Sequence, residues 1–208
     1  MTAIAIVDYG VGNLRSIEKA FAAVGSPATV SNDVEVLEQA NALVLPGVGA
    51  FAACMRALCI HRFDELLVRR VKNGTPILGI CVGMQLLFEH SGEFGHTLGL
   101  ALLPGRVRRF DTHLAVPHVG WNQVVQRRKH PLLNAIEDQS FFYFVHSYFC
   151  EPAAADVIIG ETDYSRNYAS VVARDNICGV QFHPEKSQTR GLKLLSNFAQ
   201  FSTSCSLV

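Results

Sequence analysis

The chain has 208 residues, of which 49% are hydrophobic and 17% are charged. That length suffices for one domain whose core needs neither disulfides nor a metal. Basic and acidic side chains number 18 each, which excludes the strongly basic balance typical of nucleic-acid-binding proteins. We therefore expect no nucleic-acid partner.

The chain lacks the features that direct a protein to or across a membrane. Asp8 interrupts the first apolar run, and no basic residue precedes it, so the start does not resemble a secretory signal. The longest uncharged stretch, residues 39–55, is too short for a membrane span. The 6 cysteines are irregularly spaced, which favours reduced thiols. We expect a cytoplasmic protein.

The first half of the sequence alternates short apolar runs with helical stretches, which predicts an α/β fold with an open, mostly parallel sheet flanked by helices. The periodicity predicts strands at residues 3–7, 42–45 and 75–80, and helices at 13–24, 63–71 and 84–89. Asn73-Gly74 marks the end of the helix predicted at 63–71, just before the strand at 75–80.

The second half reads mainly as strands joined by loops, at residues 106–110, 141–149, 157–161, 170–173 and 177–182. We expect these to add antiparallel strands at one side of the sheet. A last helix is predicted at 189–201, followed by a frayed tail at 202–208. No linker or repeat interrupts the pattern, so residues 1–208 are predicted to form a single domain.

A cysteine flanked by glycines, in Gly79-Ile80-Cys81-Val82-Gly83-Met84-Gln85, follows the strand at 75–80. A nucleophile at a sharp strand-to-helix turn needs small residues two positions before and after it. The positive end of the next helix favours the thiolate of Cys81, and the Val82 N–H is placed to stabilise an oxyanion. The alternative is a buried structural cysteine.

A histidine and a glutamate stand two residues apart in His183-Pro184-Glu185. Residues at this spacing project to the same side of an extended chain, and Pro184 favours an extended backbone at His183. Glu185 is therefore placed to bond one ring nitrogen while the other faces a nucleophile, as in covalent acyl transfer. Taken alone the tripeptide is a weak signal, since many histidines lie beside carboxylates for structural reasons.

Two glycine-containing turns follow early strands. Pro46-Gly47-Val48-Gly49 allows close approach of a ligand and offers backbone N–H groups for an oxyanion, although an ordinary loop is the better explanation when the motif is taken alone. Gly10-Val11-Gly12 does not fit a dinucleotide fingerprint, because Arg15 occupies the place of the third glycine. Cys54 and Cys59 lack a second ligand pair at zinc spacing, so we expect neither metal nor cofactor.

The motifs together resemble the glutaminase domain of class I (triad-type) glutamine amidotransferases, in the order glycine turn, cysteine turn, His-Pro-Glu. The resemblance extends over residues 4–201 and is closest to glutaminase subunits of imidazole glycerol phosphate synthases, enzymes of histidine biosynthesis. The segments that carry it are Asp8-Tyr9-Gly10-Val11-Gly12-Asn13-Leu14, Pro46-Gly47-Val48-Gly49, Pro117-His118-Val119-Gly120-Trp121-Asn122, Phe144-Val145-His146-Ser147-Tyr148 and Gly179-Val180-Gln181-Phe182-His183-Pro184-Glu185-Lys186-Ser187.

The resemblance implies a role for each matching position. Cys81 is the nucleophile, His183 the base and Glu185 its orienting carboxylate. The remaining matches imply an oxyanion hole at Val48, Gly49 and Val82, glutamine contacts at Gly49, Gln85, His146, Ser147 and Tyr148, and an interface at Asn13, Trp121, Tyr143 and Lys186. The segment at 54–61 departs from the pattern and carries no implied role.

The implied partner is a cyclase subunit with a (β/α)₈ barrel, which forms a heterodimer with the glutaminase and receives ammonia through a channel. The family is nearly idle until the partner binds its own substrate. A peptide flip in Pro46-Gly47-Val48-Gly49 is a physical basis for this, because glycine accepts both signs of φ. We expect the resting subunit to lack one oxyanion donor.

Three alternatives stay open at the level of sequence. The same triad serves stand-alone γ-glutamyl cysteine hydrolases, which need no partner and accept peptides. The chain also fits the glutaminase of another synthase, such as the one that makes pyridoxal phosphate. A catalytically inactive binding subunit is the third alternative, and intact Cys81, His183 and Glu185 argue against it.

Overall fold

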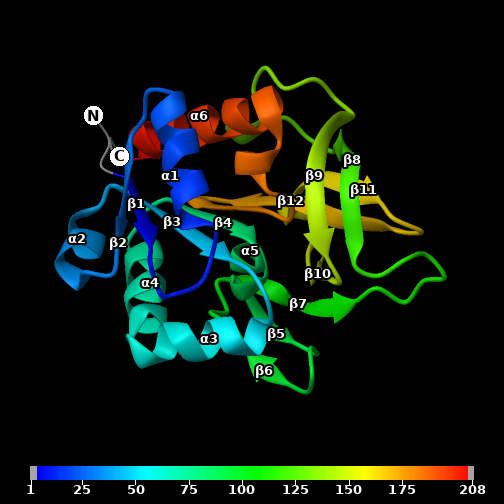
Figure 1. Cartoon of the computed structure of the whole chain (residues 1–208), viewed down its shortest axis with the longest axis horizontal. Coiled ribbons are helices and arrows are strands. Elements are labelled where there is room, and N and C mark those ends of the chain that lie inside the picture. Colours follow the sequence, from blue (N-terminus) through cyan, green and yellow to red (C-terminus); the bar gives the residue numbers. More distant parts are fainter. Residues whose placement is uncertain (1–3, 206–208) are drawn as a thin grey trace.

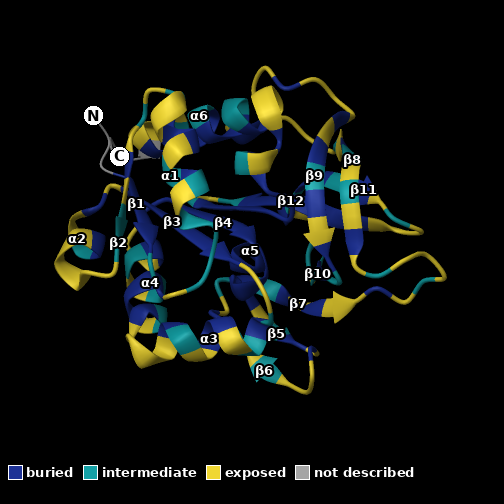
Figure 2. Cartoon of the chain, in the orientation of Figure 1, coloured by how far each residue is buried: buried dark blue, intermediate teal, exposed yellow. Residues whose placement is uncertain are grey.

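The computed structural model describes residues 4–205, which form a large mixed sheet with helices on both faces (Figure 1). The parallel part has the strand order β2-β1-β3-β4-β13. These strands are β2 (Ala28–Ser31), β1 (Ile4–Val7), β3 (Ala42–Gly47), β4 (Ile77–Cys81) and β13 (Ile177–Val180). All residues of β1, β3, β4 and β13 are buried, as expected for apolar strands covered on both faces (Figure 2).

The sheet continues past β13 into mainly antiparallel strands, which confirms the predicted change of character in the second half. The order is β12 (Asn167–Arg174), β10 (Tyr148–Pro152), β7 (Leu103–Arg109), β5 (Phe88–Ser91) and β6 (Thr97–Leu98). From β12 a branch leads through β11 (Ile158–Asp163) and β8 (His118–Gln126) to β9 (Ser140–His146). This branch lies at one end of the molecule (Figure 1).

Helices cover the parallel strands because each has one apolar face. Helices α1 (Leu14–Ala23) and α6 (Gln188–Cys205) lie on one side of the sheet, and α3 (Phe51–Ile60) and α4 (Phe63–Lys72) lie on the other (Figure 1). In α1, Ile17 and Phe21 are buried at helical spacing. The shorter elements are α2 (Val34–Gln39), α5 (Val82–Leu86), η1 (Pro131–Leu133), η2 (Ala155–Val157) and η3 (Pro184–Lys186).

The helix expected at residues 84–89 is correct only in its first half. Helix α5 starts earlier and ends at Leu86, and residues 88–91 form β5, which pairs in parallel with β7. Leu86, Leu87 and Phe88 are all fully buried. A continuous apolar run of this kind fits a buried helix and a buried strand equally well, so periodicity does not separate them.

The single strand expected at residues 141–149 is two strands. Strand β9 ends at His146, and β10 begins at Tyr148 and pairs with different neighbours, β7 and β12. At the C-terminus, α6 extends through Cys205, so residues 202–205 continue the helix where a frayed tail was expected. The rest of that tail, residues 206–208, lies outside the described residues, as does residue 3 of the first expected strand.

Other boundaries agree with the sequence. Helix α4 ends at Lys72 with Asn73 as its C-cap, and Gly74 follows with φ of +91°, a left-handed turn that glycine adopts readily. Among residues 4–205, no helix has the length and apolar character that crossing a membrane requires.

Candidate active site

Cys81 ends β4 and immediately precedes α5, with backbone angles φ 56° and ψ −114° that a non-glycine residue rarely adopts. Glycines around this turn allow the backbones of β3, β4 and α5 to come into direct contact. A Cβ on Gly83 would lie 1.8 Å from the Leu45 carbonyl oxygen, and one on Gly47 would lie 2.6 Å from the Gly83 nitrogen. A Cβ on Gly79 would meet the Gly83 carbonyl oxygen at 2.7 Å. The glycines beside Cys81 are therefore required by the packing of β3 and β4 against α5.

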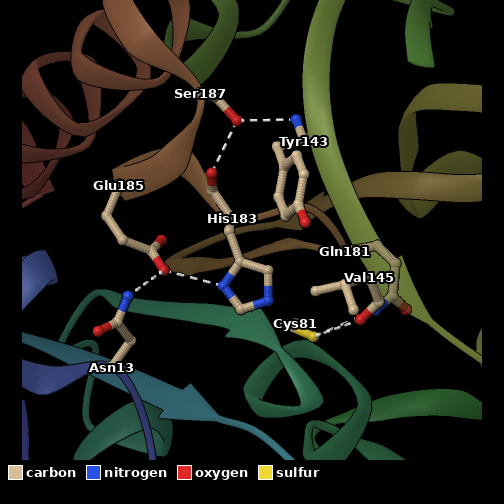
Figure 3. A network of polar contacts seen from close by, with 8 residues as sticks. All are labelled: Asn13, Cys81, Tyr143, Val145, Gln181, His183, Glu185 and Ser187. Carbon is tan, nitrogen blue, oxygen red and sulfur yellow. Dashed lines mark hydrogen bonds and ion pairs between the residues drawn. The ribbon is translucent and has the colours of Figure 1, made fainter. Parts of the chain in front are cut away.

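His183 and Glu185 form a hydrogen bond, as their spacing predicts. The Nδ1 of His183 lies 2.9 Å from Oε1 of Glu185, and their side chains are 4% and 0% exposed (Figure 3). Asn13 donates from Nδ2 to the same oxygen at 3.2 Å. Because the carboxylate accepts the Nδ1 proton, Nε2 is the ring nitrogen that can serve the nucleophile.

The imidazole of His183 lies between Glu185 and Cys81 (Figure 3). Burial disfavours the charged ring, but hydrogen bonds to Cys81 and Glu185 and the charges of both outweigh it and raise the pKa of His183 to about 10. The two side chains that the sequence separates by about a hundred positions therefore share one site. The sequence-based pairing of Cys81 with His183 agrees with this placement.

The backbone of His183 is held in place by β9. Its N–H donates to the Tyr143 carbonyl at 3.0 Å, and its carbonyl accepts from the Ser187 hydroxyl at 2.7 Å. Ser187 Oγ in turn accepts from the Tyr143 N–H at 3.0 Å (Figure 3). The position of the imidazole is thus tied directly to the strand that carries Tyr143.

A cavity of about 290 Å³ opens beside Cys81 and His183. Its lining contains every residue predicted for the oxyanion hole and for glutamine contact. The lining residues are Val48, Gly49, Cys81, Val82, Gln85, Glu93, Pro117, Val145, His146, Ser147, Tyr148 and His183. The volume suits a small polar metabolite rather than a polymer segment.

Gln181 is a neighbour of the thiol that the sequence motifs did not single out. Its Nε2 lies 3.8 Å from the sulfur of Cys81, and its Oε1 accepts from Gln85 Nε2 at 3.1 Å. Gln85 Nε2 also donates to the Tyr148 carbonyl at 3.0 Å. Both N–H groups of the Gln85 amide are therefore engaged, which fixes its orientation at the cavity wall.

Glu93 is a second residue that the sequence did not indicate. It lines the cavity, is only 8% exposed, and its Oε2 accepts from the Phe51 N–H at 2.6 Å. The Ser91 hydroxyl oxygen accepts from its backbone N–H at 3.1 Å. No motif surrounds this glutamate in the sequence; its chemistry becomes visible only because the loop after β5 brings it to the cavity.

The loop at Val48 and Gly49 lies at the cavity mouth with both residues exposed. Gly49 has φ of +82°, and a Cβ there would meet nothing within 4 Å. The Val48 carbonyl accepts from the thiol of Cys54 at 3.4 Å, and the Pro46 carbonyl accepts from the Tyr9 hydroxyl at 2.5 Å. Hydrogen bonds from the side chains of Cys54 and Tyr9 thus fix two carbonyls of this segment.

Three of the four predicted interface residues lie together. Trp121 and Tyr143 are cross-strand partners on β8 and β9 with ring centroids 6.1 Å apart, and Lys186 Nζ lies 5.8 Å from the Tyr143 ring centroid. We call their surroundings the β8–β9 face; its exposed apolar members are Val119, Trp121, Val125, Phe141 and Val145. Exposed segments of β8 and β9 are visible in Figure 2. Asn13, the fourth, turns its amide to Glu185.

Among residues 4–205, no three His, Cys, Asp or Glu side chains cluster as metal ligands would.

Comparison with known proteins finds matches over nearly the whole chain. The family model described as glutamine amidotransferase class-I matches residues 5–200. The imidazole glycerol phosphate synthase subunit HisH of Syntrophotalea carbinolica is 49% identical over 94% of this chain and 98% of its own length. The protein of the same name from Geobacter sulfurreducens is 47% identical over 96% of this chain and 99% of its own length.

Solved structures share the fold at low sequence identity. A crystal structure of a glutamine amidotransferase superposes with a TM-score of 0.75 at 17% identity, covering 98% of this chain and 99% of that one. The PurLQS structure from Thermotoga maritima superposes with a TM-score of 0.74 at 17% identity, covering 97% of this chain and 99% of that one. The predicted fold is confirmed, and the chain belongs to the class I glutamine amidotransferase family.

Proposed function

We propose that this chain is the glutaminase subunit of an imidazole glycerol phosphate synthase, which hydrolyses glutamine through Cys81 and passes the ammonia to a cyclase subunit. The observation that carries the proposal is the meeting of Cys81 and His183 at one cavity, with Glu185 bonded behind the imidazole at 2.9 Å. The near-full-length identity to HisH proteins supports the choice of synthase.

The chemistry is acyl transfer through a thioester. The Cys81 sulfur attacks the side-chain amide carbon of glutamine, and the resulting oxyanion takes N–H groups from Val82 and the Val48–Gly49 segment. His183, which has taken the proton of the Cys81 thiol, delivers it to the departing nitrogen, so that ammonia leaves and a γ-glutamyl thioester remains. Water then attacks the thioester carbon, His183 takes its proton, and the sulfur is released from glutamate.

The cavity suits the polar groups of glutamine. Glu93 is an acidic side chain in its wall and complements the α-ammonium group. Gln85, Ser147 and Tyr148 also line the cavity. In this proposal they contact the substrate along its length. A glutamine residue joined to a peptide through its α-nitrogen has an amide in place of that ammonium and loses the charge pairing with Glu93, whereas a γ-glutamyl peptide keeps it.

The β8–β9 face is the proposed docking surface for the cyclase subunit. Exposed aromatic and aliphatic side chains gather on it beside Lys186, and its residue Val145 also lines the cavity. A (β/α)₈ barrel seated there forms a heterodimer and closes the cavity towards its own active site. Ammonia released at Cys81 then has a short path to the partner.

Activity is proposed to depend on the partner through the loop at Val48 and Gly49. Loss of one oxyanion donor typically raises a barrier by about 3 kcal/mol, or roughly a hundredfold in rate. The positive φ of Gly49 and the free space around it allow the peptide to change orientation. Seating of the loaded cyclase turns a backbone N–H towards the oxyanion.

The test measures ammonia from glutamine with the chain alone, with the cyclase subunit, and with the cyclase and its nucleotide substrate. The proposal predicts a low rate alone and a steep rise in the last condition. Full activity without any partner, together with cleavage of γ-glutamyl peptides, would identify a stand-alone hydrolase instead. Failure to bind the cyclase would point to another synthase.

A further inference from the structure

A chain of buried polar side chains adjoins the cavity without taking part in the proposed chemistry. His146 Nδ1 lies 2.8 Å from the Tyr148 carbonyl oxygen, and His146 Nε2 lies 3.2 Å from the Tyr168 hydroxyl. The same hydroxyl lies 3.4 Å from His118 Nδ1, and His118 Nε2 lies 3.4 Å from Asn122 Nδ2. The chain crosses from β10 through β9 and β12 to β8.

One carbonyl fixes the direction of every proton in this chain. A carbonyl only accepts, so His146 Nδ1 carries the proton and, in the neutral ring, Nε2 accepts from the Tyr168 O–H. The Tyr168 oxygen then accepts from His118 Nδ1–H, and His118 Nε2 accepts from the Asn122 amide. The Asn122 amide is itself oriented, because its Oδ1 accepts from the Gln123 N–H at 2.8 Å.

Both histidines stay neutral in the folded chain. Burial lowers the pKa of His146 to about 3, with further lowering by the charges of His118 and His183 and an opposing contribution from the bond to the Tyr148 carbonyl. Burial likewise lowers the pKa of His118 to about 4. The proton order derived above therefore holds at neutral pH.

The two ends of the chain reach functional surfaces. The Tyr148 carbonyl also accepts from Gln85 Nε2 at 3.0 Å, and Tyr148 and Gln85 both line the cavity. At the other end, Asn122 follows Trp121 on β8, next to the β8–β9 face, and donates a second N–H to the Asp163 carbonyl at 2.8 Å.

We propose that Tyr168 and His146 are positioning residues, which hold the Tyr148 carbonyl and with it Gln85 in the orientation that binds glutamine. The inference rests on the proposed function, since it takes glutamine as the ligand of the cavity. Neither side chain touches the reacting atoms. Removing the Tyr168 hydroxyl leaves His146 Nε2 buried without its donor, which frees the ring to turn and weakens its hold on the Tyr148 carbonyl.

Tyr164 is a matched control for packing. Its ring stacks on His118 with centroids 3.9 Å apart, and its hydroxyl donates to the Ala115 carbonyl at 2.7 Å, outside the chain. Tyr164→Phe and Tyr168→Phe therefore remove the same atom from the same aromatic cluster, and only Tyr168→Phe interrupts the hydrogen-bond chain.

The experiment compares both variants in the complex with the cyclase and its nucleotide substrate. Tyr168→Phe is expected to raise KM for glutamine about five- to tenfold, with kcat changed less than about twofold, and Tyr164→Phe to leave both within about twofold. In a Cys81→Ala background, glutamine titrated calorimetrically should bind Tyr168→Phe about five- to tenfold more weakly. Equal KM and equal affinity for the two tyrosine variants would overturn the inference, as would a loss confined to kcat.

A measurement on the wild-type chain keeps the inference testable if Tyr168→Phe does not fold. Nitrogen NMR of the histidine rings should find His146 and His118 neutral at pH 7 with the proton on Nδ1; a proton on Nε2 of His146 contradicts the chain. A wild-type complex that releases no ammonia would refute the proposed function itself. An active wild type with an unaltered Tyr168→Phe variant refutes only the positioning role.

Discussion

Asn13 and Glu185 stand 172 positions apart and meet in a hydrogen bond of 3.2 Å, on the same carboxylate oxygen that His183 Nδ1 approaches at 2.9 Å. Asn13 occupies the N-cap position of α1, but its side chain makes no capping bond there. The amide therefore serves Glu185 instead of the helix. The orienting carboxylate is fixed from two sides, and the triad is supported by a fourth residue from the first βα connection.

This arrangement predicts graded effects of two substitutions. Glu185→Gln keeps the shape but loses the charge that orients and stabilises the imidazolium, so kcat for glutamine hydrolysis should fall by about 10² to 10⁴. Asn13→Ala removes one of the two hydrogen-bond partners of Glu185 Oε1, so kcat for glutamine hydrolysis should fall about three- to tenfold. Steady-state kinetics of the loaded complex measure both. An Asn13→Ala loss that appears only as weaker cyclase binding would show that Asn13 acts at the interface and not on Glu185.

The glycine at the nucleophile turn predicts a large effect on stability. Gly83→Ala places a methyl group 1.8 Å from the Leu45 carbonyl oxygen. Because the clash is with backbone, it can be relieved only by moving β3 or α5, so the free energy of unfolding should fall by at least ~3 kcal/mol. Gly92→Ala is the control, since a Cβ there has its nearest neighbour at 4.0 Å. Urea unfolding compares the two. Similar midpoints would contradict the backbone contact between α5 and β3.

The buried histidines predict a loss of stability in mild acid. Their folded pKa values, about 4 for His118 and about 3 for His146, lie below the unfolded value near 6.5, so the unfolded chain binds more protons as the pH falls from 6.5 towards these values. The contribution of these two histidines to stability is therefore full above pH 6.5 and declines below it. His118→Gln should reduce the slope of unfolding free energy against pH by up to ~1.4 kcal/mol per unit. An unchanged slope in His118→Gln would contradict this prediction.

The β8–β9 face predicts which substitutions weaken the complex. Trp121, 45% exposed and central among apolar neighbours, has the character of a binding hot spot, so Trp121→Ala should raise the Kd for the cyclase subunit at least about tenfold. Leu98→Ala is the control, because Leu98 is 69% exposed on β6 outside that face. Titration calorimetry of each variant with the cyclase distinguishes them. Equal affinity losses would place the interface elsewhere.

The parts of the site that the sequence predicted are those with local signatures. The glycines around Cys81 and the two-residue spacing of His183 and Glu185 express constraints that act within a few residues, and their geometry follows from backbone sterics. Gln181 and Glu93 were missed because each meets its partners across long sequence separations, Gln181 at Cys81 and Glu93 at Phe51. No local pattern marks Glu93 as a site residue, and Gln181 lies in a segment that carries the resemblance without having been given a role there.

The same limit explains the errors in secondary structure. Helix α3 and strand β8 were not predicted, and the run from Leu86 to Phe88 was assigned wholly to a helix. The first turn of α3 is set by tertiary contacts, since its N-terminal N–H at Phe51 is bonded by Glu93. Strand β8 is exposed along one side, so its pattern lacks the strong apolar alternation of a core strand.

The account depends most on the covalent step at Cys81. Complex loaded with the cyclase's nucleotide substrate is mixed with glutamine, quenched in acid during turnover, digested and examined by mass spectrometry. We expect one γ-glutamyl group on the peptide that contains Cys81, and neither this adduct nor ammonia with Cys81→Ala. Ammonia release that persists in Cys81→Ala, or an adduct found only on another cysteine such as Cys59, would contradict the account.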